Sequence, residues 1–86
     1  MIIKLTKSFR RQVQSLKPAQ QKRLKTALLL FQTEPYHSEL YNHPLTGEWK
    51  GHRSISFGGD WRAHYQVIDK ETALFVAAGT HSQLYK

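Results

Sequence analysis

The sequence predicts an α+β fold in which two N-terminal helices pack on one face of a small, mainly antiparallel, four-stranded sheet. Apolar residues recur at helical spacing through residues 9–31, whereas strand-like alternation begins after Trp49. The expected order of elements is β-α-α-β-β-β. Neither a repeat nor a long linker interrupts the 86 residues, so we expect a single domain spanning residues 1–86.

The first predicted elements are a short strand and a helix. The opening residues, MIIKL, have the composition of a strand. Either Thr6 or Ser8 can cap the helix that follows, because a hydroxyl oxygen accepts a backbone N–H of the first turn. Phe9, Val13 and Leu16 then fall on one helical stripe, which predicts the side that packs against the sheet.

A second helix is predicted from Pro18 to just before Pro35. Proline fits the first turn of a helix, where an N–H is not needed. The residue before a proline disfavours helical angles, so Pro35 marks the end of the helix. The apolar stripe between them consists of Leu24, Ala27, Leu28 and Phe31. Residues 34–48, with two prolines and a glycine, are expected to form a polar connector.

Three strands are predicted in the rest of the chain, at residues 50–57, 61–69 and 72–79. Residues directly opposite one another in a hairpin share a face of the sheet. A turn of Gly58 and Gly59 alone would pair apolar with polar side chains. A three-residue loop, 58–60, avoids this, and such loops are common when a glycine takes the left-handed position. The expected pairs are then Phe57 with Trp61 and Ile55 with Ala63.

This register gathers polar residues on the other face of the hairpin. Ser56 then lies opposite Arg62, Ser54 opposite His64, and His52 opposite Gln66. Asp60 lies in the loop at the end of the same ladder. The last strand, ALFVAA, is apolar at both alternating positions and is expected inside the sheet. The predicted architecture therefore leaves one sheet face open, and that face carries arginine and histidine.

The chain is strongly basic. Its 13 Lys and Arg residues against 6 Asp and Glu give a formal net charge of +7, and residues 1–33 contain no acid. Such a field attracts a polyphosphate or an acidic protein, although a solvated basic helix face is equally compatible with it. Cysteine is absent, which excludes a disulfide or thiolate metal site. The chain has no signal peptide or bilayer-length apolar run, so we expect a cytoplasmic protein that does not engage a membrane.

An open face with arginine, histidine and aspartate suits chemistry on a phosphodiester. RNA is cleaved without a metal when its 2′-hydroxyl attacks the adjacent phosphorus, which requires a base, an acid and a cation for the developing charge. Histidine serves both proton transfers, and arginine binds phosphate in bidentate fashion. No cofactor or metal is expected, because no histidine pair has the i, i+4 spacing with a carboxylate partner. The available side chains are His43, His52, His64, His81, Arg53 and Arg62.

Each candidate also has an ordinary structural interpretation. His43 precedes Pro44 and can stabilise a turn, and His64 can be a satisfied strand residue. Asp60 beside two glycines suits a turn, and Tyr85 can be a packing aromatic. Taken singly, none of them identifies a function.

Together, five short motifs resemble those of a known family. They are HPL, WKG, DWR, GTH and a terminal LY, in that order between His43 and Tyr85. In this set the chain is similar to the RelE/ParE superfamily of bacterial type II toxins, and within it to the YafQ-like branch of ribosome-dependent mRNA interferases. Residues 1–42 resemble the family only in their strand–helix–helix pattern and basic character. The resemblance implies a RelE-like fold that binds mRNA on a concave basic face in the ribosomal A site.

The resemblance also implies a catalytic set of His43, Asp60, Arg62 and His81. His43, Asp60 and His81 match catalytic positions of the YafQ-like branch. Arg62 falls where the RelE branch has its transition-state arginine. We expect His81 as the main proton-transfer group and Arg62 as the phosphate clamp. Asp60 and His43 are expected to position groups or exchange protons.

The substrate-binding set is expected to contain Lys50, His52, Arg53, Ser56, His64 and Tyr85. Tyr85 resembles the C-terminal aromatic that stacks on or orients the substrate base. Ser56 is a departure, because the YafQ-like branch has a further catalytic histidine at this position. Serine is a poor proton-transfer group, so we expect Arg62 to fill the charge-stabilising part of that role. His52 or His64 would then supply the imidazole.

These observations predict a toxin that cleaves mRNA during translation and is neutralised by a cognate antitoxin in a hetero-oligomer. Its partners would be the antitoxin, the ribosome and mRNA. One alternative is a ParE-like inhibitor of DNA gyrase, although such chains usually lack the histidine set. Another is a catalytically weak relative that only binds RNA or a partner. Residues 1–33, which lack acids, would offer a surface to an acidic antitoxin segment that folds on binding.

Overall fold

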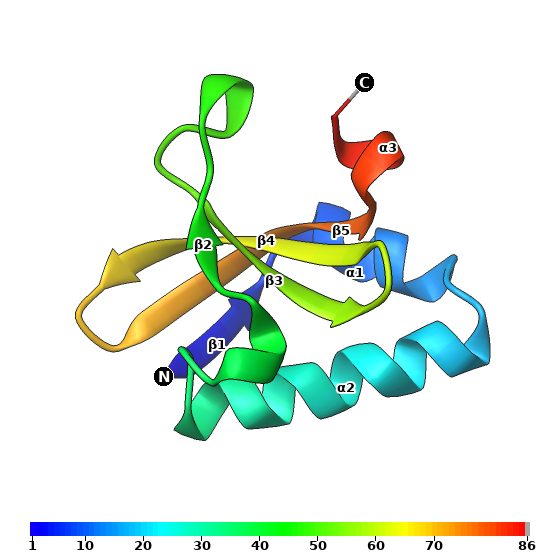
Figure 1. The fold of residues 1–86 in the computed structure, drawn as a ribbon, viewed down its shortest axis with the longest axis horizontal. Coiled ribbons are helices and arrows are strands. Elements are labelled where there is room, and N and C mark those ends of the chain that lie inside the picture. Colours follow the sequence, from blue (N-terminus) through cyan, green and yellow to red (C-terminus); the bar gives the residue numbers. More distant parts are fainter. Residues whose placement is uncertain (86) are drawn as a thin grey trace.

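The structure, a computed structural model, describes residues 1–85. They form a five-stranded sheet with the two N-terminal helices packed on one face (Figure 1). The strands lie in the order β1-β5-β4-β3-β2. β1 runs parallel to β5, and the other neighbours are antiparallel. The elements are β1 (Ile2–Leu5), α1 (Lys7–Gln14), α2 (Pro18–Thr33), β2 (His43–Pro44), β3 (Arg53–Gly58), β4 (Trp61–Asp69), β5 (Thr72–Thr80) and α3 (His81–Leu84), with 3₁₀ turns η1 (Ser38–Leu40) and η2 (Gly47–Trp49).

The predicted α+β class is confirmed, but the sheet has five strands and not four. The additional strand, β2, consists of two residues at the sheet edge, where His43 pairs with Ser54 and Pro44 with Arg53. It lies within the segment predicted to be an irregular connector. Two residues are too few to show the alternation by which a strand is recognised. A short third helix, α3, also follows β5 directly.

Both N-terminal helices begin where the sequence predicts, and α2 also ends there, but α1 ends at Gln14, before Leu16 of its predicted apolar stripe. Thr6 is the N-cap of α1, and its Oγ1 accepts the N–H of Phe9 at 3.1 Å. Pro18 occupies the first turn of α2. That helix ends at Thr33, before Pro35. Local sequence signals therefore account for where both helices begin.

An aromatic core joins both helices to the same face of the sheet. The ring of Phe31 on α2 lies 4.9 Å from Tyr65 on β4 and 5.3 Å from Phe75 on β5, between ring centroids. Phe9 on α1 lies 5.6 Å from Phe75. All four side chains are at most 1% exposed. Burial of such side chains is the main stabilising contribution in a domain of this size.

The hairpin of β3 and β4 has the predicted register except at its tip. Ile55 pairs with Ala63 and Ser56 with Arg62, as expected. Gly58, and not Phe57, pairs with Trp61, because the register shifts between Ser56 and Gly58. Gly58 and Gly59 have φ angles of 126° and 51°, which only glycine adopts without strain. The prediction placed Gly58 in the loop, whereas in the structure Gly58 belongs to the ladder and Phe57 is the extra residue of a bulge.

The start of β3 is a second difference in the hairpin. The strand begins at Arg53 and not at residue 50, because η2 and a turn precede it. In that turn the N–H of His52 donates to the carbonyl of Trp49 at 3.0 Å. His52 thus lies outside the ladder, and its predicted pairing with Gln66 is wrong. The interior position predicted for the last strand is confirmed, since β5 lies between β1 and β4.

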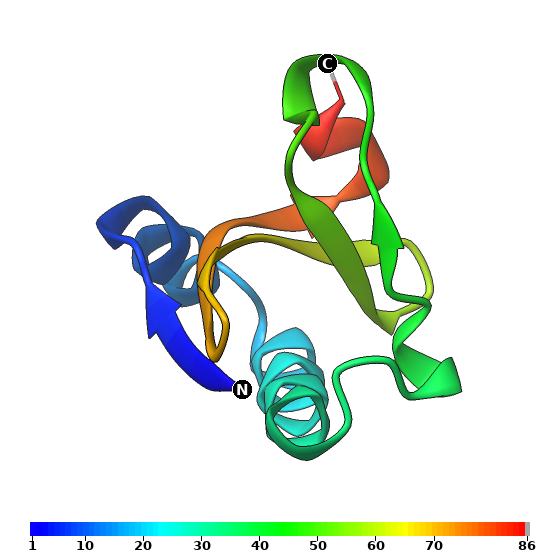
Figure 2. The same ribbon diagram turned by 90° about the vertical axis from the view of Figure 1, so that its left-hand side faces the viewer.

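Two peripheral segments rise from the sheet face opposite α2. They are the stretch from β2 to β3, which contains η2, and the C-terminal stretch with α3 (Figure 1). Viewed from the side, they approach each other above the sheet (Figure 2). The indole Nε1 of Trp49 donates to the carbonyl of Leu84 at 3.1 Å and joins them. No helix in residues 1–85 is long and apolar enough to span a membrane.

Replacing Phe31 by alanine tests the aromatic core. We expect Phe31→Ala to lower the free energy of unfolding by about 3–5 kcal/mol, because it removes ring contacts and leaves a cavity. Leu29→Ala is the control on the same helix, since Leu29 is 57% exposed, and should change it by about 0.5 kcal/mol or less. Urea denaturation followed by circular dichroism measures both. Equal losses in the two variants would contradict the assigned core.

Candidate active site

Polar side chains form two rows across the face of the sheet opposite the helices. In the first row, His43 on β2 pairs with Ser54 on β3, which pairs with His64 on β4. In the second row, Ser56 pairs with Arg62. Directly opposed residues share a face, so both rows lie on one surface. The predicted arrangement of Ser56 with Arg62 and of Ser54 with His64 is confirmed.

Arg62 is held in place by uncharged oxygens. Its Nη1 donates to the carbonyl of Gly59 at 2.8 Å, to the carbonyl of Trp61 at 3.1 Å and to Oγ of Ser56 at 3.3 Å. None of these three acceptors carries a charge that would neutralise the guanidinium. All three bonds use Nη1, which leaves the other donors of the guanidinium for a ligand. The arginine is therefore oriented and keeps its charge for an anion such as phosphate.

Asp60 and His81 meet at one end of the sheet. The N–H of His81 donates to the carbonyl of Asp60 at 3.1 Å, which links the hairpin loop to the start of α3. Both residues are exposed. Thr80 begins α3 with a capping box, in which its hydroxyl accepts the N–H of Gln83 and the Gln83 side chain accepts the N–H of Thr80. These contacts fix where His81 stands.

Tyr85 connects His81 with the sheet. Its ring lies 4.5 Å from the imidazole of His81 with an interplanar angle of 32°, and 5.5 Å from that of His64. Partial burial raises the pKa of the Tyr85 hydroxyl, and the charge of Arg62 opposes that rise.

His43 is exposed at the sheet edge in a defined tautomer. Its Nδ1 lies 2.8 Å from the carbonyl of Tyr41, and a carbonyl can only accept. Nδ1 therefore donates, and the lone pair of Nε2 is free to accept a proton in the neutral ring. Tyr41 has a φ of 49°, an uncommon conformation for a residue other than glycine.

The sheet face is partly covered, which corrects the expectation of an open surface. Trp49 lies 4.7 Å from the ring of His64 at an angle of 73°, and Tyr85 covers the same imidazole from the other segment. We call Trp49 and Tyr85 the aromatic roof. Beneath it His64 is 0% and Ser54 1% exposed. His64 and Ser54 are thus core-like residues in this conformation and not part of a wet panel.

The environment of His64 disfavours its charged form. Burial, together with like charge on the neighbouring His52, His43 and Arg62, lowers the pKa of His64 to about 4. Its Nδ1 lies 3.1 Å from Oγ of Ser54. Its Nε2 is buried and has no hydrogen-bond partner within residues 1–85. At neutral pH this imidazole is uncharged.

Three predicted substrate-binding residues are placed differently from the rest. Arg53 pairs with Tyr65 and so lies on the sheet face that packs against the helices. There its Nε donates to Oδ1 of Asn42 at 2.8 Å, and its guanidinium lies 5.3 Å from the centre of the Tyr36 ring. His52 packs against the indole of Trp49 at 5.4 Å. Lys50 is exposed just after η2. The structure brings Arg53 to neither polar row.

The sequence interpretation missed Trp49 and α3. The run from Thr80 to Gln83 has the T-x-x-Q pattern of a capping box, which is a signal for α3. The WKG motif begins with Trp49, but no local signal shows its structural role, because that role arises from a contact with a segment 35 residues away. Within the part of the chain that the structure describes, no group of three or more His, Cys, Asp or Glu residues is placed to hold a metal ion.

Fold and site together define a class of protein. It is a small basic α+β domain whose sheet presents an oriented, unneutralised arginine beside exposed imidazoles and a carboxylate. Such a surface fits a phosphodiester and proton transfer to or from it.

Comparison with known proteins identifies the family. A family model described as "Bacterial toxin of type II toxin-antitoxin system, YafQ" matches residues 1–86, and the chain belongs to this family. It is 38% identical over 58 residues to the mRNA interferase toxin YafQ of Escherichia coli (strain K12), across 67% of this chain and 62% of that relative. The match thus spans less than two thirds of the relative's length.

Solved structures agree with this assignment. A chain of the E. coli DinJ-YafQ complex superposes with a TM-score of 0.70 at 28% identity, covering 98% of this chain and 97% of that one. A YoeB/ParE toxin from Agrobacterium tumefaciens gives a TM-score of 0.76 at 15% identity, covering 94% and 99%. The second likeness concerns the fold alone, and it confirms the RelE-like architecture.

The buried neutral state of His64 predicts how stability depends on pH. Above pH 6.5 the imidazole is neutral in both folded and unfolded chains. Between pH 6.5 and about 4 the unfolded chain binds a proton that the folded chain does not, so stability falls as the pH falls, by up to about 3 kcal/mol. His64→Leu should remove this part of the pH dependence. Urea titrations of both proteins from pH 7.5 to 4 measure the difference, and parallel curves would contradict a neutral buried His64.

Proposed function

We propose that this protein is the toxin of a type II toxin–antitoxin system and cleaves mRNA on the ribosome without a metal. Membership of the YafQ family supports the proposal, as does the name of the curated relative, mRNA interferase toxin. The strong positive charge of the chain suits a partner made of RNA.

One observation carries the proposal. Four segments bring His43, Asp60, Arg62 and His81 to one face and one end of the sheet. The register with β3 places Arg62 over Ser56, and the backbone bond between Asp60 and His81 joins the other two segments. Residues far apart in sequence thus supply a cation, imidazoles and a carboxylate to one face of the sheet and its adjoining end. This is the set that attack by a 2′-hydroxyl requires.

The proposed reaction needs only proton transfers and charge stabilisation. The 2′-oxygen of the substrate attacks the adjacent phosphorus, the bond from phosphorus to the 5′-oxygen breaks, and a 2′,3′-cyclic phosphate forms. The proton of the 2′-hydroxyl passes to a base, and the departing 5′-oxygen takes a proton from an acid. His81 is the main proton-transfer group, and Arg62 binds the phosphate oxygens as charge develops. His43, with Nε2 free to accept a proton, and Asp60 complete the exchange or orient the substrate.

Removing Arg62 or His81 tests this function. Arg62→Ala and His81→Ala should each lower cleavage of mRNA in a translation extract by about 100-fold or more, measured by mapping the new 5′ ends. Arg11→Ala is the control, because Arg11 is exposed on α1 and lies outside the site. Cleavage at wild-type rates by both site variants would refute the catalytic assignment.

Mapping of 5′ ends together with a DNA gyrase supercoiling assay separates the alternatives. Cuts at defined positions within codons support a ribosome-dependent nuclease. Inhibition of DNA supercoiling without any cuts would support a ParE-like gyrase inhibitor. Neither effect would indicate a relative that only binds RNA or a partner.

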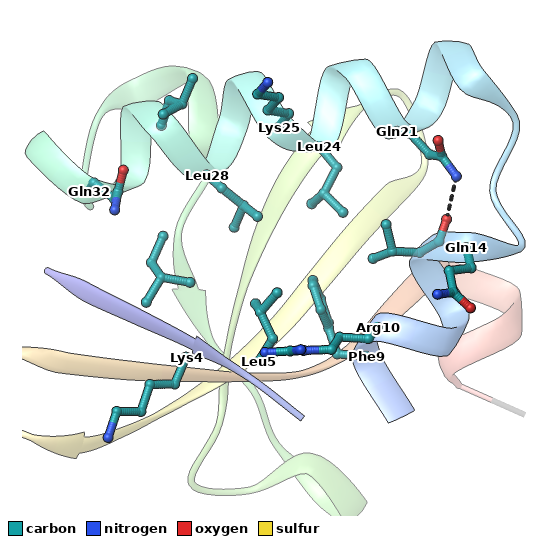
Figure 3. Close-up of a pocket in the computed structure, with 13 residues that line it drawn as sticks. Lys4, Leu5, Phe9, Arg10, Gln14, Gln21, Leu24, Lys25, Leu28 and Gln32 are labelled. Atoms are coloured by element: carbon teal, nitrogen blue, oxygen red, sulfur yellow. Dashed lines mark hydrogen bonds between the residues drawn. The ribbon is translucent and has the colours of Figure 1, made fainter. Parts of the chain in front are cut away.

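A groove on the helix side suits the antitoxin. It has a volume of about 850 Å³ and lies between α1, α2 and β1 (Figure 3). Its apolar lining includes Leu5, Leu24 and Leu28, while Lys4, Arg10 and Lys25 supply positive charge. All its lining residues fall within residues 1–33, which contain no acid. An apolar floor with basic residues fits one face of an acidic amphipathic helix.

We therefore propose that an acidic amphipathic segment of the antitoxin docks in this groove. The E. coli complex of DinJ with YafQ is a precedent for a protein partner. The groove lies on the helix side of the sheet, whereas Arg62 and His81 belong to the other side and its end. Docking here would leave room for a second antitoxin segment to cover the site.

Charge reversal in the groove tests this docking. Lys25→Glu should weaken binding of the cognate antitoxin by about tenfold or more, because an acidic helix then meets a like charge. Lys22→Glu on the same helix is exposed and lies outside the groove lining, so it controls for the change in net charge. Isothermal titration calorimetry at low and high salt measures both. Equal weakening by the two variants, or a salt-independent affinity, would contradict docking in the groove.

A further inference from the structure

The buried imidazole of His64 lowers the stability of the fold. Its imidazole is fully buried, yet Nε2 has no hydrogen-bond partner within residues 1–85. A buried polar atom without a partner costs free energy. An apolar side chain of similar volume would fill the same space without that cost. Stability alone therefore does not explain an imidazole beneath the aromatic roof.

The ring contacts of His64 lead to the proposed catalytic histidine. The His64 imidazole meets Tyr85 at 5.5 Å, and Tyr85 in turn meets His81 at 4.5 Å. On its other side the His64 ring meets Trp49 at 4.7 Å. Trp49 also holds the C-terminal segment through its bond to the carbonyl of Leu84. Through these contacts His64 supports both halves of the roof from below.

We propose that His64 is a positioning residue whose buried ring holds Tyr85 and through it His81 in place over the sheet. The catalytic consequence rests on the proposed function, whereas the structural consequence does not. The contact of 3.1 Å between Nδ1 of His64 and Oγ of Ser54 fixes the ring to β3. Packed between Trp49 and Tyr85, a planar ring presents one orientation to both roof residues, which a flexible aliphatic side chain cannot do.

The groups around His64 favour the neutral form of its imidazole. His43 on β2, His52 before β3 and Arg62 on β4 all lower the pKa of His64. Tyr85, which also contacts His81, faces it from the C-terminal segment. A charged His64 would add a further cation beneath the roof and oppose those already present. Because burial and these neighbours hold the pKa near 4, the ring supports the roof throughout the physiological range.

Two replacements of His64 distinguish the effect of its ring from the effect of filling the same buried space. His64→Leu fills the space without a ring. We expect its thermal midpoint to equal or exceed that of the wild type, while kcat for ribosome-bound mRNA falls by about tenfold or more and KM changes little, because a displaced catalytic group costs rate. His64→Phe keeps a ring against Tyr85 and should retain kcat within about threefold of the wild type. Gln66→Leu, an exposed position on the same strand, is the matched control and should change neither quantity.

Proton NMR of the His81 ring provides a readout that does not depend on activity. In the wild type the ring of Tyr85 should shift the His81 resonances, because the rings are 4.5 Å apart. These resonances should move toward the values of free histidine in His64→Leu and remain in place in His64→Phe.

Two other outcomes decide against the proposal, and a third separates it from the proposed function. If His64→Leu leaves the His81 resonances and kcat unchanged, His64 positions nothing. If His64→Phe loses activity as fully as His64→Leu while His81 stays in place, the imidazole acts chemically and not as a support. If even the wild type fails to cleave mRNA, the proposed function fails, and the NMR comparison still decides whether His64 positions His81.

Discussion

Strand β4 is the element on which the rest of the structure depends. On one face Ala63, paired with Ile55, and Tyr65 enter the core beneath the helices. On the other face Arg62, paired with Ser56, and His64 belong to the site. Successive side chains point to opposite faces, so a shift of one residue would exchange the two sets. The pairing of β3 with β4 therefore fixes the core and the site at once.

The site is completed by segments that contribute little to that core. The stretch containing η2 and the C-terminal helix α3 come from different parts of the chain and meet through Trp49 and Leu84. They place an aromatic roof over His64 and bring His81 to the end of the sheet beside Asp60. A rigid sheet supplies Arg62, while short peripheral segments supply the groups around it. Functional residues are often carried in this way, on connecting segments positioned by a stable scaffold.

Much of the fold and part of the candidate site could be predicted because their determinants are local. Thr6 caps α1 and Pro18 begins α2 through chemistry confined to a single turn. The pairing of Ser56 with Arg62 followed from alternation and the need to keep one face dry. The two-residue strand β2 escaped prediction because it exists only through its pairing with β3. Likewise, the bulge at the hairpin tip depends on the backbone angles of Gly58 and Gly59, which alternation does not reveal.

By itself, the sequence determined the order of the main elements, the basic character of the chain and the face of β4 to which Arg62 and His64 belong. Only the tertiary structure decided which of those two side chains stays accessible. Trp49 and Tyr85 reach His64 from distant segments and bury it, whereas Arg62 is held by Ser56 and nearby carbonyls and keeps its charge for a ligand. Alternation assigns a side chain to a face, but burial depends on what the rest of the chain folds over that face.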